Sequence, residues 1–151
     1  MAEEKSMIDV KLLSQPVTLP EQEALHEQLG GECIFLGRTR RETHDQHGEL
    51  QRLRYEAYEP MAVHVLNELA RYAADQWRCG LVRVHHAVGE VPPGEASVLV
   101  QVMCGHRAEA FEACRYLIDA LKERAPIWKR EQWADGTTWA HGRAVPQPGD
   151  D

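Results

Sequence analysis

Apolar residues along this chain occur either in short runs or at helical spacing, and the two kinds of segment alternate. The short runs predict strands, which we place at 32–39, 50–58, 81–88 and 96–103. An apolar residue at every fourth position over 61–77 predicts a long helix, which begins at Pro60 and stops at 79–80. A second long helix is predicted over 107–124, because Pro126 disfavours helical backbone at the residue before it.

The remaining segments are richer in polar and turn-forming residues. A short helix is predicted over 20–29, closed by the glycine pair that follows it. The polar segment 40–49 predicts a loop, and the Pro- and Gly-containing segment 89–95 predicts a connection between two strands. The end of the chain predicts a hairpin around Asp135-Gly136.

The composition agrees with one domain of the α+β class. The chain has 151 residues, 43% of them hydrophobic and 27% charged, which suffices for one modest core. This balance excludes a collagen-like chain, a disordered tail and a disulfide-rich miniprotein. We expect a single domain over 1–151, with two long helices packed on a largely antiparallel sheet. Its core should span about 7–143, followed by a flexible tail over 144–151.

Net charge and cysteine spacing narrow the class further. The formal net charge of −7 excludes general binding to nucleic acids or anionic membranes, because both need a broadly cationic surface. No apolar run approaches the roughly 18–20 residues of a membrane span, and the N-terminus does not resemble a signal peptide. We therefore expect a cytoplasmic protein with reduced, buried thiols and no zinc cluster, since no CxxC pair occurs among its cysteines, Cys33, Cys79, Cys104 and Cys114.

Positive charge is nevertheless concentrated in two segments. Residues 38–54 and residues 104–130 each carry a net charge of +2 within an acidic chain. Such a distribution is typical of a protein that binds a small anion, such as a phosphate ester or a carboxylate. The alternative is that these arginines are solvated or paired with neighbouring glutamates.

The positions of the basic residues favour a binding site. Gly37 directly precedes Arg38 and Arg40, and a glycine at a strand end permits the close approach of another backbone. His106 and Arg107 open the second long helix, where free N–H groups favour an anion. A histidine at this position can also act simply as a helix cap. The interpretation as an anion-binding site therefore depends on the histidine and the arginine together.

Lysine is rare, with 13 arginines against four lysines, a ratio that codon bias explains. Helical spacing places Lys122 beside Phe111, on the edge of the apolar stripe of the second helix. A lysine held in a partly dry pocket loses proton affinity and becomes a base or a nucleophile. Lys129 follows the break at Pro126 and is expected to fold back toward the same place.

A metal site is not expected. His85 and His86 are adjacent on a predicted strand, and neighbouring strand residues point to opposite faces.

Six ordered motifs resemble the large, catalytic subunit of molybdopterin synthase, the MoaE family. The segment KERAPIWKRE at 122–131 resembles the family signature K-x-R-x-P-x-W-K-x-E. The other five motifs are FLGRTR (35–40), YEAYEPMA (55–62), GEVPPGEASV (89–98), GHRAEAFEA (105–113) and the hairpin WADGTTW. The resemblance covers about residues 7–143.

This resemblance implies an α/β hammerhead fold with an additional small antiparallel β subdomain. It implies a sulfurtransferase that converts cyclic pyranopterin monophosphate into molybdopterin by forming its dithiolene, without a metal or a cofactor. The sulfur donor would be a small ubiquitin-like carrier subunit whose C-terminal Gly-Gly ends in a thiocarboxylate. Two large subunits would form a homodimer, and a carrier at each end would complete a heterotetramer.

The motifs also assign roles to individual residues. Lys122 and Lys129 match the paired active-site lysines of the family. The matched substrate-binding residues are Arg38, Arg40, His106, Arg107 and Arg143, of which Arg38 stands where a lysine is frequent. Phe35 and Gly37 match the channel that receives the tail of the carrier.

Two other classes of function remain open. One is a non-catalytic α+β module that binds a small phosphorylated ligand through the same basic residues, and the other is a structural subunit. Lys122 and Lys129 favour the enzyme, because a binding module needs charge but does not need two lysines at that helix break.

Overall fold

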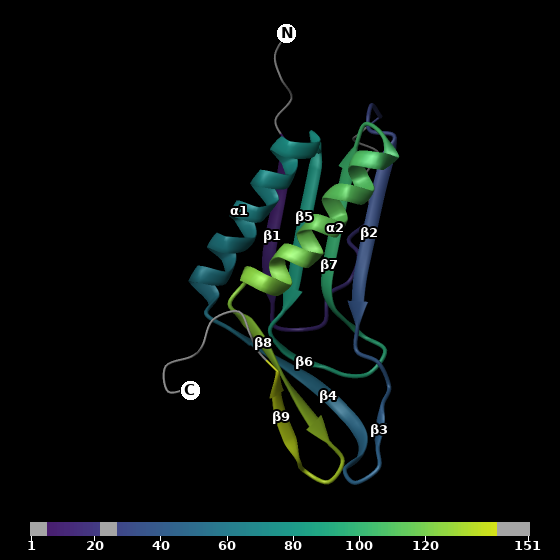
Figure 1. The fold of residues 1–151 in the computed structure, drawn as a ribbon, viewed down its shortest axis with the longest axis vertical. Coiled ribbons are helices and arrows are strands. Elements are labelled where there is room, and N and C mark those ends of the chain that lie inside the picture. The colour runs from purple at the N-terminus through teal and green to yellow at the C-terminus, as the bar shows by residue number, and fades with distance from the viewer. Residues whose placement is uncertain (1–5, 22–26, 142–151) are drawn as a thin grey trace.

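A four-stranded sheet and two helices form the larger part of the computed structural model, which describes residues 6–21 and 27–141 (Figure 1). The sheet has the strand order β1-β5-β7-β2, and its strands are β1 (Met7–Leu13), β5 (Leu81–Ala87), β7 (Ala96–Cys104) and β2 (Gly31–Arg38). Strands β1 and β5 are parallel, and the other two pairs are antiparallel. The prediction of a largely antiparallel sheet is confirmed.

Both long helices, α1 (Glu59–Trp77) and α2 (Arg107–Arg124), cover the same face of this sheet (Figure 1). The sheet meets them with valines from its central strands, which are fully buried: Val82, Val84, Val100 and Val102. Helix α1 ends at Arg78, whose φ of 52° and ψ of 48° are left-handed and stop the helical hydrogen bonding. Among the described residues, neither helix is long and apolar enough to span a bilayer.

A smaller antiparallel sheet lies below the four-stranded sheet in the view of Figure 1. Its strands are, in spatial order, β3 (Thr43–His44), β4 (Gly48–Ala57), β8 (Ile127–Trp133) and β9 (Thr138–His141). The short strand β6 (Gly89–Val91) pairs with residues 53–55 of β4. Leu50, Leu53 and Trp133 form its own small apolar cluster. The α+β class with an additional small β subdomain is therefore confirmed.

Most predicted elements agree with the structure to within two residues, including the hairpin, whose Gly136 has a φ of 91°. The prediction of a loop over 40–49 was wrong, because this segment contains β3 and the start of β4, which form a hairpin. Strand β1 and the short β6 were not predicted. The helix predicted over 20–29 falls largely on 22–26, and the tail 144–151 also lies outside the described residues.

Candidate active site

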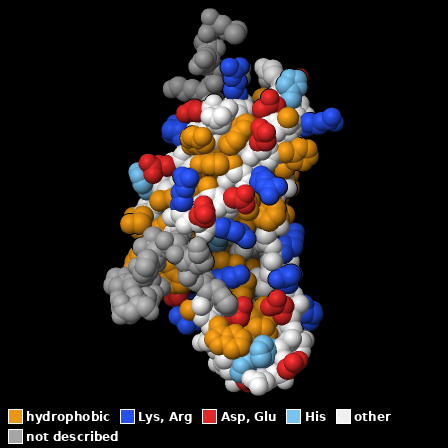
Figure 2. All heavy atoms as spheres, in the orientation of Figure 1, with side chains coloured by type: hydrophobic (Ala, Val, Ile, Leu, Met, Phe, Trp, Pro, Cys, Tyr) orange, Lys and Arg blue, Asp and Glu red, His pale blue; other side chains and the backbone are white. Residues whose placement is uncertain are grey.

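A cavity of about 510 Å³ lies where the last turn of α2 and the end of β2 meet strands β4 and β8. We call it the central pocket. Four basic residues line it, Arg38, Arg40, Lys122 and Lys129, together with two acidic residues, Glu42 and Glu131. Figure 2 shows Lys and Arg side chains around this junction between the helical layer and the small sheet. The two basic segments of the sequence therefore meet at one site.

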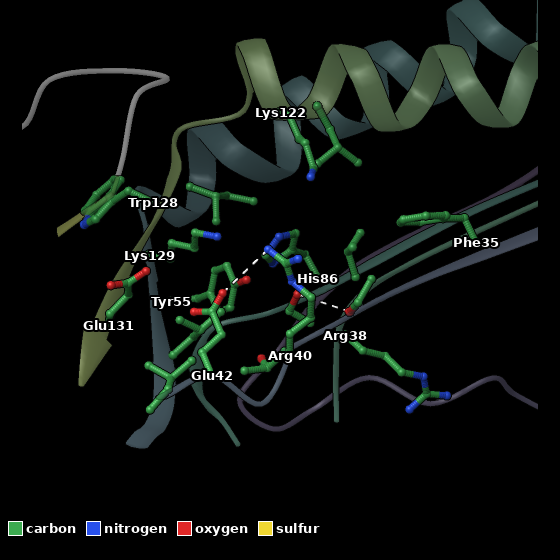
Figure 3. Close-up of a pocket in the computed structure, with 18 residues that line it drawn as sticks. Phe35, Arg38, Arg40, Glu42, Tyr55, His86, Lys122, Trp128, Lys129 and Glu131 are labelled. Carbon is green, nitrogen blue, oxygen red and sulfur yellow. Dashed lines mark hydrogen bonds and ion pairs between the residues drawn. The ribbon is translucent and has the colours of Figure 1, made fainter. Parts of the chain in front are cut away.

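Lys122 and Lys129 reach this pocket from two different elements (Figure 3). Lys122 lies in the last turn of α2, and extended backbone at Ala125 then turns the chain into β8. Lys129 on β8 is paired with Tyr55 on β4, so both side chains lie on the face that looks into the pocket. Neither lysine forms an ion pair with another described residue, so both ammonium groups are available to a ligand.

Helical spacing predicted Lys122 and Phe111 on the edge of the buried stripe of α2, and both residues are exposed. The Phe111 side chain is 64% exposed, and the buried stripe of α2 is formed mainly by small residues such as Ala110 and Ala113, with Leu117. Alanines let the helix pack closely on the sheet, which rotates Phe111 toward solvent. Lys122 is itself exposed and reaches the pocket because the end of α2 overhangs it.

Two arginines at the end of β2, Arg38 and Arg40, behave differently. Figure 3 shows the Arg40 side chain reaching toward the middle of the pocket, where it lies 3.6 Å from Glu42. The Arg38 guanidinium points away and donates a hydrogen bond of 2.9 Å to the carbonyl of Gly94. Arg40 is therefore placed to bind an anion, whereas Arg38 anchors the rim of the pocket.

Phe35 and Gly37 lie at the edge of the pocket that β2 forms. Phe35 is 39% exposed, although it is a large apolar residue. A Cβ atom on Gly37 would lie only 2.7 Å from Cγ1 of Val98, so the position has no room for a side chain. The register of β2 also shifts between Gly37 and Arg38, which turns the chain out of the sheet.

Tyr55, His86 and Ser97 line a more enclosed part of the pocket. The rings of Tyr55 and His86 meet edge to face, with their centroids 5.1 Å apart. Burial raises the pKa of Tyr55 above its ordinary value. Burial, together with the nearby Lys122 ammonium, lowers the pKa of His86 to about 4, although the bond to the carbonyl of Ala87 opposes this shift. His86 is therefore neutral near pH 7.

The structure does not bring His106 and Arg107 to the same pocket. Arg107 and Lys122 lie 15 residues apart on α2, so about 22 Å of helix separates them. Both His106 and Arg107 are exposed at the far end of the helix. Arg143 lies outside the described residues. The catalytic and binding roles of all these residues stay predictions.

Sequence reasoning gave no role to several pocket residues. Tyr55 and Trp128 lie within quoted motifs, and Glu131 ends the lysine motif, but none was considered for the site. His86 was considered only as a metal ligand together with His85. Its signal was a histidine within a strand that is otherwise largely apolar and buried. Within the described chain, no group of three or more His, Cys, Asp or Glu side chains is placed to hold a metal ion.

Known proteins resemble this chain over most of its length. The profile of the family described as MoaE protein matches residues 5–124. The molybdopterin synthase catalytic subunit of Nostoc sp. is 41% identical over 138 residues, which cover 89% of this chain and 82% of that protein. The subunit of the same name from Pyrococcus abyssi is 37% identical, with 91% and 95% of the two chains covered.

Solved structures extend this likeness to the fold. The crystal structure of molybdopterin synthase from Staphylococcus aureus matches with a TM-score of 0.76 and 27% identity, and covers 87% of this chain and 96% of that one. A complex of subunits 1 and 2 of molybdopterin-converting factor from Helicobacter pylori matches with a TM-score of 0.71 and 23% identity, and covers 93% and 95%. At that identity the second likeness shows the fold alone.

Proposed function

We propose that this chain, which belongs to the MoaE protein family of molybdopterin synthase catalytic subunits, transfers sulfur to cyclic pyranopterin monophosphate and so forms the dithiolene of molybdopterin. The sulfur comes from the C-terminal thiocarboxylate of a small ubiquitin-like carrier. The observation that carries this proposal is the convergence of Lys122, Lys129 and Arg40 on one pocket from three separate segments.

The substrate carries a cyclic phosphate, and the pocket offers cationic groups to hold it. Arg40 reaches into the middle of the pocket, where it forms charge-assisted hydrogen bonds to phosphate oxygens. Because Glu42 at 3.6 Å is its only ion-pair partner among the described residues and Arg40 is largely exposed, an incoming anion displaces little structure.

Each sulfur transfer replaces one C–O bond of the substrate by a C–S bond and breaks the acyl C–S bond of one carrier. Water supplies an oxygen to the carrier, whose C-terminus then ends in an ordinary carboxylate. Because the dithiolene contains two sulfur atoms, its formation consumes two thiocarboxylated carriers. Opening of the cyclic phosphate and attack by sulfur both require proton transfer. We assign this role to Lys122 as general acid and base, or as a transient covalent partner of the carrier acyl group. Lys129 stabilises the developing anion and positions the thiocarboxylate.

The carrier tail enters along β2, past Phe35 and Gly37. A Gly-Gly tail is narrow and needs close backbone approach, which a glycine such as Gly37 at a strand end permits. The Helicobacter pylori complex pairs two subunits of molybdopterin-converting factor on this fold. By the same pairing, a small carrier subunit is the partner of this chain.

A second copy of this chain completes the assembly. His106 and Arg107 lie about 22 Å of helix away from Lys122, so one chain cannot place all three on one substrate. A homodimer that brings the start of α2 from one copy to the pocket of the other would unite them. With one carrier for each copy, the assembly is a heterotetramer.

The reaction needs no metal or cofactor in this proposal, because the sulfur arrives already activated. We place it in the cytoplasm, where thiols such as the buried Cys79 and Cys104 stay reduced.

The test is product formation from purified protein, thiocarboxylated carrier and cyclic pyranopterin monophosphate, followed by mass spectrometry. Lys122→Ala should lower the rate by at least about 100-fold, the usual contribution of a general acid or base. Lys11→Ala removes an exposed lysine from β1, away from the pocket, and should leave the rate unchanged. Near-normal turnover by folded Lys122→Ala would refute the assignment. Ligand binding without turnover by the wild type would instead indicate a non-catalytic module.

A further inference from the structure

His86 is a buried histidine in the central pocket that the mechanism above does not use. Its side chain is only 5% exposed, yet it lines the pocket and lies at the centre of Figure 3, below Lys122 and beside Tyr55. Strand β5 holds its backbone between β1 and β7, where it is paired with Leu12 and Val98. The ring is therefore fixed in position by the main sheet.

The hydrogen bonding of His86 decides which ring nitrogen carries the proton. Nδ1 lies 2.8 Å from the carbonyl oxygen of Ala87, and a carbonyl oxygen only accepts hydrogen bonds. Nδ1 must therefore carry the hydrogen. Since burial keeps the ring neutral, Nε2 carries a lone pair and accepts hydrogen bonds. Nε2 has no hydrogen-bond partner within 6–21 and 27–141.

This lone pair is unusual in its surroundings. The cationic groups that reach into the pocket, Arg40, Lys122 and Lys129, only donate hydrogen bonds. Of the two pocket carboxylates, Glu42 is paired with Arg40, and Glu131 accepts a hydrogen bond from the indole of Trp133. Phosphate oxygens at neutral pH mainly accept, so an anion gains nothing from His86. Its lone pair is complementary to a group that donates.

We propose that His86 is a substrate-binding residue whose Nε2 accepts a hydrogen bond from an N–H group of the pterin ring of the substrate. This inference rests on the proposed function, which supplies the pterin. A pterin has amide-like and amino N–H donors on one edge of a flat ring. The cationic side of the pocket then binds the phosphate, while His86 and the adjoining Tyr55 receive the heterocycle.

The carrier tail also has N–H donors, but its place in the pocket differs. Figure 3 shows Phe35, where the tail is expected, at the edge of the pocket, whereas His86 lies at its centre beside Tyr55. The observations therefore favour the pterin over the tail.

Two substitutions of His86 test the roles of its two ring nitrogens separately. In His86→Asn the amide occupies the position of Nδ1, which keeps the bond to Ala87 but leaves no acceptor at Nε2. In His86→Gln the longer side chain can place an amide oxygen close to the position of Nε2. The probes are a phosphate-free pterin, 6-hydroxymethylpterin, and inorganic phosphate, each titrated separately by NMR against the full chain.

We expect His86→Asn to weaken pterin binding about tenfold, because an N–H donor loses its acceptor. His86→Gln should stay within about threefold of the wild type, and neither variant should change the affinity for phosphate. Arg40→Ala should show the reverse pattern. His85→Asn is the matched control, since His85 lies on the opposite face, where its Nε2 is 3.1 Å from Asp9, and its pterin affinity should be unchanged. Thermal unfolding verifies that each variant is folded.

Nitrogen-15 NMR of the His86 ring gives an independent measurement. The free protein should show a protonated Nδ1 and a bare Nε2, and pterin should shift only the Nε2 resonance. Unchanged pterin affinity in folded His86→Asn, or an unmoved Nε2 resonance, would overturn the inference. So would a variant that loses carrier affinity but keeps pterin affinity, which would assign His86 to the tail. If pterin binding depends on His86 but the wild type makes no product, the inference stands and the proposed function fails.

Discussion

Replacing Gly37 by alanine would place a methyl group between two strands that already touch. Gly37 on β2 is paired directly with Val98 on β7. An alanine Cβ would lie 2.7 Å from Cγ1 of Val98 and 3.3 Å from the ring of Phe35, whereas carbon atoms pack comfortably at about 3.5–4.0 Å. Val98 is buried and β-branched, so it has few other rotamers to adopt. The two strands must therefore move apart.

The size of this effect follows from two opposing contributions. Overpacking a well-packed core costs about 1–3 kcal/mol, and the lower backbone freedom of alanine in the unfolded chain returns about 0.4–1 kcal/mol. We expect Gly37→Ala to lower the free energy of unfolding by about 1–2 kcal/mol in urea denaturation, with an unchanged dependence on urea concentration.

Gly105→Ala is the matched control for this prediction. A Cβ atom on Gly105 would have no neighbouring atom within 4 Å, so its free energy of unfolding should change by less than about 0.5 kcal/mol. Because the methyl on residue 37 also presses on Phe35, Gly37→Ala should weaken carrier binding as well, measured by calorimetry. If Gly37→Ala were as stable as Gly105→Ala, the steric reasoning would be refuted.

Two further predictions concern stability. Burial lowers the pKa of His86 to about 4, so between pH 6.5 and 4 the unfolded chain binds a proton that the folded chain does not. The free energy of unfolding should therefore fall by about 3 kcal/mol over that range, and urea denaturation of His86→Gln should lack this part of the dependence. Leu117 on α2 is 1% exposed in the main core, so Leu117→Ala should cost about 3–5 kcal/mol; a loss below 1 kcal/mol in the same assay would contradict this packing.

Local signals were sufficient to predict the helices and the long strands. The four-residue spacing over 61–77 and the proline at 126 act within one segment, so no knowledge of the partners was needed. Strand β1 also carried a signal, since Ile8, Val10 and Leu12 alternate with polar residues and pack against the core. It was missed although this alternation is a local signal, and its parallel partner β5 lies more than 70 residues away. The short β3 and β6 exist through pairing with β4 and have no pattern of their own.

The site was predictable where a motif placed residues near a chain reversal. Lys122 and Lys129 lie on either side of the break at Pro126, so one local feature brings them together. The buried stripe of α2 was predicted incompletely, because a helical wheel weighs large apolar residues more than alanines, and Ala110 and Ala113 are buried against the sheet. His86 could not be assigned, because its role depends on a cavity that strands β4 and β8 close from elsewhere in the chain.

The separation along α2 leads to a final prediction about assembly. Arg107 and Lys122 are about 22 Å apart on one rigid helix, so a pocket that uses both must draw them from two copies of the chain. Lys122→Ala and Arg107→Ala should each form an inactive homodimer. When equal amounts of the two variants are mixed, unfolded and refolded together, half of the dimers should contain one copy of each.

In such a mixed dimer the two pockets differ. One pocket combines both substituted residues, and the other combines the intact Lys122 of one copy with the intact Arg107 of the other. Half of the pockets in half of the dimers are then complete, so the mixture should recover about a quarter of wild-type sulfur transfer. If one chain supplied both residues to its own pocket, every pocket in the mixture would lack one of them and the mixture would stay inactive. Product formation after mixing therefore distinguishes a pocket shared between copies from a pocket within one chain.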